Sequence, residues 1–86
     1  MAIEKYYIGT VNERNGDMEY DTQYLFCTRG SPDNYSEKVT KNWRGGGVYD
    51  EEYDGYWSDD TLMSNGGYKE VPKEDFDVLK KYLANL

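Results

Sequence analysis

Tyrosine dominates the residues from which this chain can build a core. Its 86 residues include ten tyrosines, two tryptophans and two phenylalanines, and aromatic residues make up 16% of the chain. A mean hydropathy of −1.01 would by itself indicate disorder. Disordered segments are poor in aromatic residues, however, and tyrosine and tryptophan bury their rings while keeping a polar end at the surface. We therefore expect one folded domain over residues 1–86.

A β-hairpin is predicted at the N-terminus. Residues 2–11 are rich in β-branched and aromatic types, which favours a strand. The dipeptide Asn15-Gly16 follows, and both residues tolerate the positive φ angles of a tight turn. Apolar and polar residues then alternate from Met18 to Thr28, as in a strand with one buried face. The residues expected on that face are Met18, Tyr20, Tyr24 and Phe26.

A helix is predicted after this hairpin. Ser31 suits the N-cap and Pro32 the first helical position, where its missing N–H is not needed. Tyr35, Val39 and Trp43 recur at a spacing of four, so they share one face that can be buried. The glycines at 45–47 are expected to end the helix.

Two short strands and a second helix are predicted in the second half. The first strand starts at residues 56–57 and continues at 61–63 after a turn at Asp59-Asp60. A turn at 65–67 precedes a last strand at 68–71. Pro72 opens the final helix, with an apolar stripe of Phe76, Leu79, Leu83 and Leu86. The predicted fold is α+β in the order ββαββα, with both helices on one face of a small antiparallel sheet.

Composition excludes several kinds of chemistry. The chain has no histidine, which removes catalytic triads, histidine-bound metals and imidazole acid–base catalysis. Its single cysteine, Cys27, permits no internal disulfide and no cysteine-based zinc cluster, and it indicates a cytoplasmic chain. The longest apolar stretch has four residues, so no transmembrane segment is expected. We expect no enzymatic activity, no cofactor and no bound metal.

Negative charge is concentrated in one segment. Seventeen acidic and ten basic residues give a net charge of −7, which disfavours binding to nucleic acids and anionic membranes. Residues 49–60 hold six acids and no base. Part of this segment matches the calcium loop D-x-[DN]-x-[DN]-G at Asp50, Asp54 and Gly55, but Thr61 stands where that loop needs a carboxylate. A solvated acidic loop is therefore favoured over a calcium site.

Aromatic residues alternate with these acids. Tyrosine and tryptophan are frequent hot spots of protein interfaces, so an acidic segment that carries them fits a surface for a basic protein partner. The alternative is that two or three of the aromatic side chains cover the sheet, and the sequence supports both interpretations equally. The predicted partner-binding residues are Asp50, Glu51, Glu52, Tyr53, Asp54, Tyr56, Trp57, Asp59 and Asp60.

The chain is small and acidic, lacks catalytic groups and contains the run Asp50-Glu51-Glu52-Tyr53-Asp54. In this overall character it resembles the small acidic inhibitors carried by phages and mobile elements, such as anti-CRISPR and anti-restriction proteins. The resemblance implies a non-catalytic inhibitor, a monomer or weak dimer, that occupies the basic nucleic-acid-binding groove of a partner protein such as a host defence complex. Carboxylates at suitable spacing would stand in for phosphates there. The alternatives are a housekeeping interaction module and a calcium-responsive module.

Overall fold

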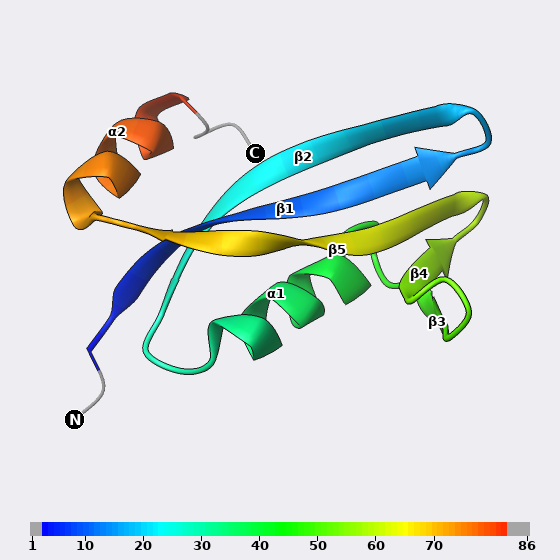
Figure 1. Cartoon of the computed structure of the whole chain (residues 1–86), viewed down its shortest axis with the longest axis horizontal. Coiled ribbons are helices and arrows are strands. Elements are labelled where there is room, and N and C mark those ends of the chain that lie inside the picture. Colours follow the sequence, from blue (N-terminus) through cyan, green and yellow to red (C-terminus); the bar gives the residue numbers. More distant parts are fainter. Residues whose placement is uncertain (1–2, 83–86) are drawn as a thin grey trace.

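The computed structural model describes residues 3–82, which form a five-stranded antiparallel sheet and two helices (Figure 1). The chain is therefore α+β, as predicted. The elements are β1 (Lys5–Asn15), β2 (Met18–Thr28), α1 (Pro32–Lys41), β3 (Val48–Asp50), β4 (Gly55–Ser58), β5 (Thr61–Val71) and α2 (Lys73–Tyr82). The predicted order ββαββα misses one strand, because the second half contains three.

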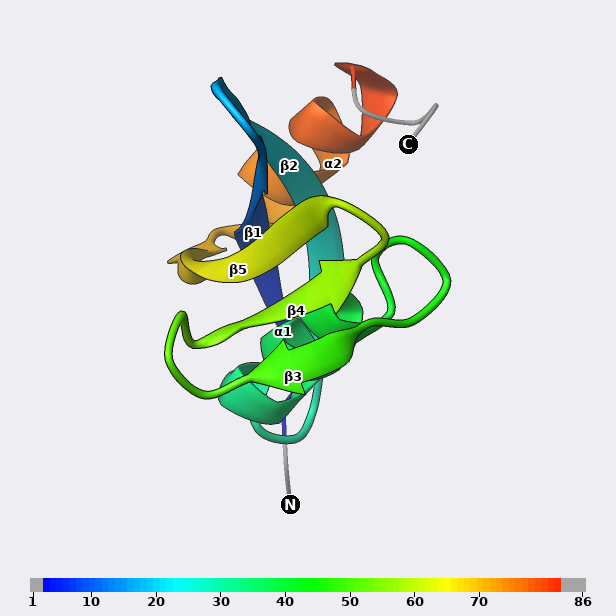
Figure 2. The ribbon, with the colours of Figure 1, turned by 90° about the vertical axis from the view of Figure 1, so that its right-hand side faces the viewer.

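The strands lie in the order β2-β1-β5-β4-β3, so the N-terminal hairpin and the last strand form the long part of the sheet. Figure 2 shows that the sheet twists, with β3 and β4 crossing beneath β5 at an angle to β1 and β2. A right-handed strand twist of this kind accumulates across any open sheet. The strand order leaves β2 and β3 as the two edges of the sheet.

The hairpin prediction is confirmed, with its turn one residue later than expected. β2 has the predicted bounds, whereas β1 begins at Lys5 and continues four residues beyond Val11 to Asn15; residues 1–2 lie outside the described part. Asn15 pairs with Met18, which leaves Gly16 and Asp17 as the two-residue loop. Gly16 has a φ of 58°, the left-handed conformation that glycine adopts without strain.

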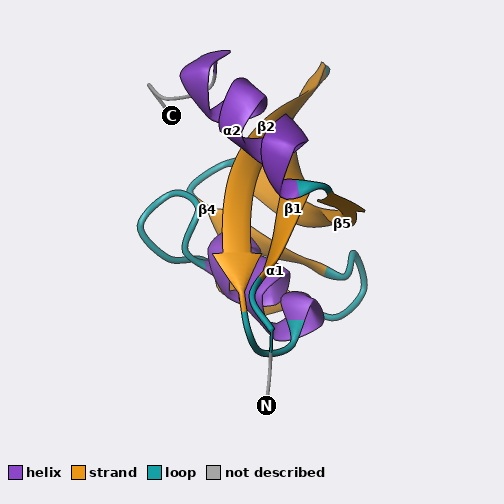
Figure 3. Cartoon of the chain, turned by 90° about the vertical axis from the view of Figure 1, so that its left-hand side faces the viewer, coloured by secondary structure: helices purple, strands orange, loops and turns teal. Residues whose placement is uncertain are grey.

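The two helices cover opposite faces of the sheet, so the prediction of one shared face is wrong. Successive side chains of a strand point to opposite faces. Tyr7 stacks on Phe26, with 4.9 Å between ring centroids, and Phe26 stacks on Tyr35 of α1 at 4.5 Å. Tyr6, the neighbour of Tyr7 in β1, instead packs on Phe76 of α2, with 5.0 Å between ring centroids. β1 has aromatic side chains on both faces, and each face requires its own helix; Figure 3 shows the helices well apart.

The core lies between α1 and the sheet. Its buried residues are Tyr7, Val11, Tyr24, Phe26 and Met63, with Val39 and Trp43 packed against them. This confirms a core built largely from aromatic rings. Two predicted core residues are not in it: Met18 and Tyr20 remain 67% and 46% exposed near the hairpin tip.

The predicted cap of α1 is confirmed. The Ser31 side chain accepts a hydrogen bond from the Asn34 backbone N–H at 3.3 Å, and Pro32 is the first helical residue. The helix ends at Lys41, ahead of the glycines, so Trp43 lies beyond it and reaches the core from the following turn. Ser36 and Thr40 are fully buried, because small side chains let the helix lie close to the sheet.

The predicted turn at residues 65–67 is wrong: β5 runs through it without a break. Gly9 of β1 pairs with Tyr68, but Val11 pairs with Asn65, so one β1 residue opposes two glycines of β5. This is a β-bulge, and Gly67 has a positive φ of 89°, which glycine adopts without strain. A Cβ on Gly66 would come within 2.9 Å of the Thr10 side chain, so glycine at position 66 lets β5 and β1 approach closely.

The second helix carries charges that suit its dipole, with Glu74 and Asp75 in the first turn and Lys80 and Lys81 in the last. Phe76 is buried and Leu79 is half-buried, as the apolar stripe predicts; Leu83 and Leu86 of that stripe lie outside the described residues. No described helix has the length and apolar character needed to span a membrane.

Replacing Tyr24 by phenylalanine is expected to raise the free energy of unfolding by about 1 kcal/mol. The Tyr24 hydroxyl is buried and has no hydrogen-bond partner among the described residues. A buried hydroxyl without a partner has lost its hydrogen bonds to water, and the phenylalanine ring fills the same space without that cost. Chemical denaturation at pH 7 measures the difference, and a destabilised variant would mean that the hydroxyl is hydrogen-bonded in solution.

The same substitution is expected to reduce the loss of stability at high pH. Burial, with a smaller effect of Tyr35, raises the pKa of Tyr24 from 10.0 to about 12. Between these values the unfolded chain has released the proton and the folded chain retains it, so the stability falls as the pH rises from 10 to 12. Tyr24 contributes about 2–3 kcal/mol to that fall, and the variant lacks this part.

Candidate partner-binding surface

The β3–β4 hairpin carries most of the predicted site residues. Tyr49 of β3 pairs with Tyr56 of β4, and Asp50 pairs with Gly55. Asp54 ends the intervening loop with a φ of 49°, which aspartate tolerates better than most residues. A Cβ on Gly55 would come within 2.8 Å of the Met63 carbonyl oxygen of β5, so only glycine fits there.

Two of the acidic side chains hold this hairpin together. Asp50 accepts a hydrogen bond from the Glu52 backbone N–H at Oδ1 and another from the Trp57 indole N–H at Oδ2, both at 2.9 Å. Asp54 accepts a hydrogen bond from the Tyr49 hydroxyl at 2.8 Å, and this bond raises the pKa of Tyr49. Asp50 and Asp54 therefore have structural roles within the loop.

The aromatic side chains of the segment divide between the two roles that the sequence left open. Tyr56 and Trp57 are half-buried on the sheet. The Tyr56 hydroxyl donates a hydrogen bond to Glu37 of α1 at 3.0 Å. Desolvation and this hydrogen bond raise the pKa of Tyr56. Tyr49 and Tyr53 are each 51% exposed, and Tyr53 stands edge-on to Trp57 with 6.1 Å between centroids. Tyr53 is thus the aromatic side chain most available at the tip of the loop.

The remaining acids of the segment are exposed and unpaired. Glu51 and Glu52 lie in the β3–β4 loop, and Asp59 and Asp60 form the predicted turn between β4 and β5. None of these four forms an ion pair with a described basic residue. The ion pairs present lie elsewhere and join Lys5 to Glu70, Arg44 to Glu13, and Lys73 to Asp77.

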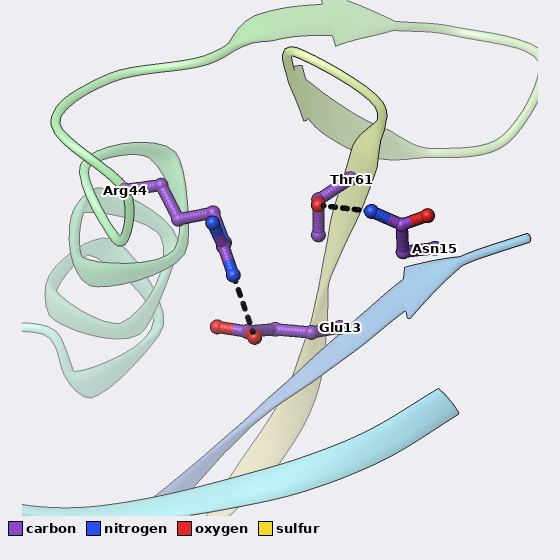
Figure 4. Close-up of polar contacts among 4 residues, drawn as sticks. All are labelled: Glu13, Asn15, Arg44 and Thr61. Atoms are coloured by element: carbon purple, nitrogen blue, oxygen red, sulfur yellow. Dashed lines mark hydrogen bonds and ion pairs between the residues drawn. The ribbon is translucent and has the colours of Figure 1, made fainter. Parts of the chain in front are cut away.

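A third acidic turn lies at the same end of the molecule. The Asn15 side chain at the end of β1 donates a hydrogen bond to the Thr61 hydroxyl at 3.2 Å, which ties the β1–β2 tip to the β4–β5 turn (Figure 4). Figure 1 places the tips of the β1–β2, β3–β4 and β4–β5 hairpins in its right-hand part, and Figure 2 shows the β3–β4 loop and the β4–β5 turn at the two ends of β4. We call the exposed carboxylates of these turns the acidic end: Asp17, Glu51, Glu52, Asp59 and Asp60.

Sequence reasoning missed two contributors to this surface. Asp17 joins it only because β5 pairs with β1, a contact that joins distant parts of the chain. Arg44 anchors the segment leading into β3: its Nη2 lies 3.7 Å from Oε2 of Glu13, whose side chain is only 6% exposed (Figure 4). A hydrogen bond with Tyr20 and the charge of Glu13 raise the pKa of Arg44. The signal for a buried Glu13 was its place in the alternation with Tyr7 and Val11.

The acids that match the calcium-loop pattern do not converge. Asp50 and Asp54 accept hydrogen bonds from Trp57 and Tyr49, and residues 3–82 contain no group of three potential protein ligands that could hold a metal ion. Thr61, at the position of the missing carboxylate, is buried in β5 and accepts a hydrogen bond from Asn15. Weak or absent calcium binding stays a prediction, now with a geometric reason.

Comparison of the chain with family models, with curated proteins and with solved structures finds no match.

Proposed function

We propose that the protein is a non-catalytic inhibitor that binds a basic surface of a partner protein through its acidic end. The observation that carries this proposal is that three separate turns in the same part of the molecule each carry exposed, unpaired carboxylates. Charges that serve only solubility do not have to gather at one end of a molecule. An excess of unpaired carboxylates in one part of a molecule attracts a basic protein at long range and speeds its association.

A nucleic-acid-binding groove is the basic surface that we propose for the partner. Such grooves carry lysine and arginine side chains spaced to meet phosphates. The carboxylates of the acidic end are held on short turns of a single sheet, so their spacing is largely fixed before binding. Preorganisation of this kind lowers the entropic cost of association. Tyr53, exposed beside Glu52, would add an aromatic anchor.

The environment of Cys27 supports a non-catalytic role. Burial, with smaller contributions from Glu4, raises the pKa of the Cys27 thiol, so less of the nucleophilic thiolate is present at neutral pH. The buried Glu13 is paired with Arg44. Both groups therefore have structural explanations.

Reversing three charges of the acidic end is expected to slow association with the partner at least tenfold at low salt. The variant combines Glu51→Lys, Glu52→Lys and Asp60→Lys, which changes the net charge from −7 to −1. Asp54 is left in place because it holds the hairpin through Tyr49. The partner is first captured from a bacterial lysate at low and high salt, and its binding rates are then measured at two ionic strengths.

A matched variant separates the location of the charge from its total. Glu4→Lys, Glu70→Lys and Glu74→Lys give the same net charge of −1 from exposed positions at the opposite end of the sheet. We expect this control to retain most of the association rate and its salt dependence. Equal rates for both triple variants would contradict a role for the acidic end and favour a housekeeping module whose acidity serves solubility.

A further inference from the structure

The two edges of the sheet differ in a way that the acidic end does not explain. β3 is a three-residue edge, and short edge strands resist pairing with other chains. β2 is an eleven-residue edge without proline, glycine or lysine, and its register with β1 has no bulge. Proteins usually protect a long edge with one of these devices. No described residue pairs with the outer side of β2 (Figure 1).

The two acids of β2 lie in its first half, so they leave the second half of this edge without a charge. The Asn12 side chain of β1 donates hydrogen bonds to Glu19 at 3.2 Å and to Asp21 at 2.9 Å. Both carboxylates are thereby held over the sheet. The backbone groups on the outer side of the strand stay accessible.

The hairpin turn determines which backbone groups point outward. A two-residue turn closes with a hydrogen bond between its flanking residues, here Asn15 and Met18, and hydrogen-bonded pairs then alternate along an antiparallel ladder. The even-numbered residues of β2 therefore bond to β1. Glu19, Asp21, Gln23, Leu25 and Cys27 direct their backbone N–H and C=O groups outward.

We propose that β2 pairs with β2 of a second copy in an antiparallel arrangement, which joins two sheets into one of ten strands. The distribution of charge along β2 favours this occupant: its first half carries Glu19 and Asp21, and the outward-bonding residues of its second half are uncharged. A two-fold axis at Gln23 overlaps the whole strand and sets Asp21 opposite Leu25 and Glu19 opposite Cys27. Parallel pairing in register would instead set each acid opposite its own copy, which is destabilising.

The same axis gives the exposed apolar residues near the hairpin tip a partner. On the face that α1 covers, it sets Tyr20 opposite Phe26 and Met18 opposite Thr28 of the second copy. Cross-strand aromatic pairs stabilise a sheet. The interface remains small and joins two chains of charge −7, so the dimer is weak and strengthens as salt screens the repulsion. Binding of a basic partner to the acidic end has the opposite salt dependence.

The test compares Gln23→Pro with Gln23→Ala by sedimentation equilibrium up to about 1 mM protein, where weak contacts become measurable. Proline removes one outward N–H that β1 does not use, and alanine retains it. We expect wild type and Gln23→Ala to form dimers increasingly with concentration and salt, and Gln23→Pro to remain monomeric with an unchanged circular dichroism spectrum.

Amide hydrogen exchange of the wild-type chain gives a readout that does not depend on a variant. Slower exchange at high concentration is expected at the odd-numbered residues 19–27, with little change at the even-numbered ones. A wild-type chain that stays monomeric throughout, or Gln23→Pro dimers as strong as those of Gln23→Ala, would overturn the proposal.

Discussion

Replacing Arg44 by alanine is expected to lower the free energy of unfolding, because it removes the positive charge that faces the buried Glu13 carboxylate. The Glu13 side chain is 6% exposed, and Arg44 is its ion-pair partner across 3.7 Å. Removing the guanidinium leaves a carboxylate buried without an opposite charge, which costs far more than the loss of a surface ion pair. Arg44 itself is half-exposed, so water reaches the vacated space and reduces the cost. Urea denaturation of wild type and variant measures it.

Making the same substitution in a Glu13→Gln variant separates the effect of the buried charge from the effect of the packing of Arg44. In Glu13→Gln the side chain is neutral, and Arg44→Ala should then lower the free energy of unfolding by less than it does in the wild-type chain. The difference between the two backgrounds is the coupling energy of the pair. An equal cost of Arg44→Ala in both backgrounds would show that the arginine acts only through the packing of its aliphatic part.

The Arg44–Glu13 pair illustrates what the sequence contains and what it omits. Glu13 follows Tyr7 and Val11 at even spacing in β1, so the alternation already placed it on the core face. Nothing local identified Arg44 as its partner, since the two residues are 31 positions apart in sequence. A charge sum that counts Glu13 as surface therefore overstates the exposed acidity of the hairpin.

Local signals predicted the elements that local interactions determine. The bounds of β2, the Ser31 cap of α1 and the Asp59-Asp60 turn are all predicted correctly, because each depends on residues close in sequence. Gly66-Gly67 was misread as a turn, because the same dipeptide serves a turn and a bulge and only the pairing with β1 selects between them. β3 was missed because three residues are too short to show alternation.

The faces of the sheet required information that the sequence does not hold locally. The apolar stripe of α2 predicted a buried side but not which face of the sheet it covers. That choice follows from Tyr6 and Tyr7, adjacent aromatic residues that point to opposite faces. For the candidate surface, composition locates the acidic segment. The separation of structural acids such as Asp50 from exposed ones such as Glu51 depends on hydrogen bonds across the hairpin.

Replacing Gly9 by alanine is expected to lower the free energy of unfolding by about 3 kcal/mol, at the upper end of overpacking effects. Gly9 lies opposite Tyr24 in β2, and the Tyr24 ring lies across the glycine. A Cβ at this position would come within 2.4 Å of Cζ of that ring, far inside van der Waals contact. The ring cannot easily move aside, because it is packed against Phe26 and Trp43.

Two further variants test this explanation of Gly9. Gly30→Ala meets only the Thr28 side chain at 3.7 Å, so its effect should stay within about 0.5 kcal/mol. Tyr24→Leu removes the ring atoms that would collide, so adding Gly9→Ala to it should cost clearly less than in wild type. Strict additivity of the two substitutions in thermal or urea denaturation would mean that the cost arises from the backbone of β1, because a collision with the ring predicts that the second change is cheaper once the ring is gone.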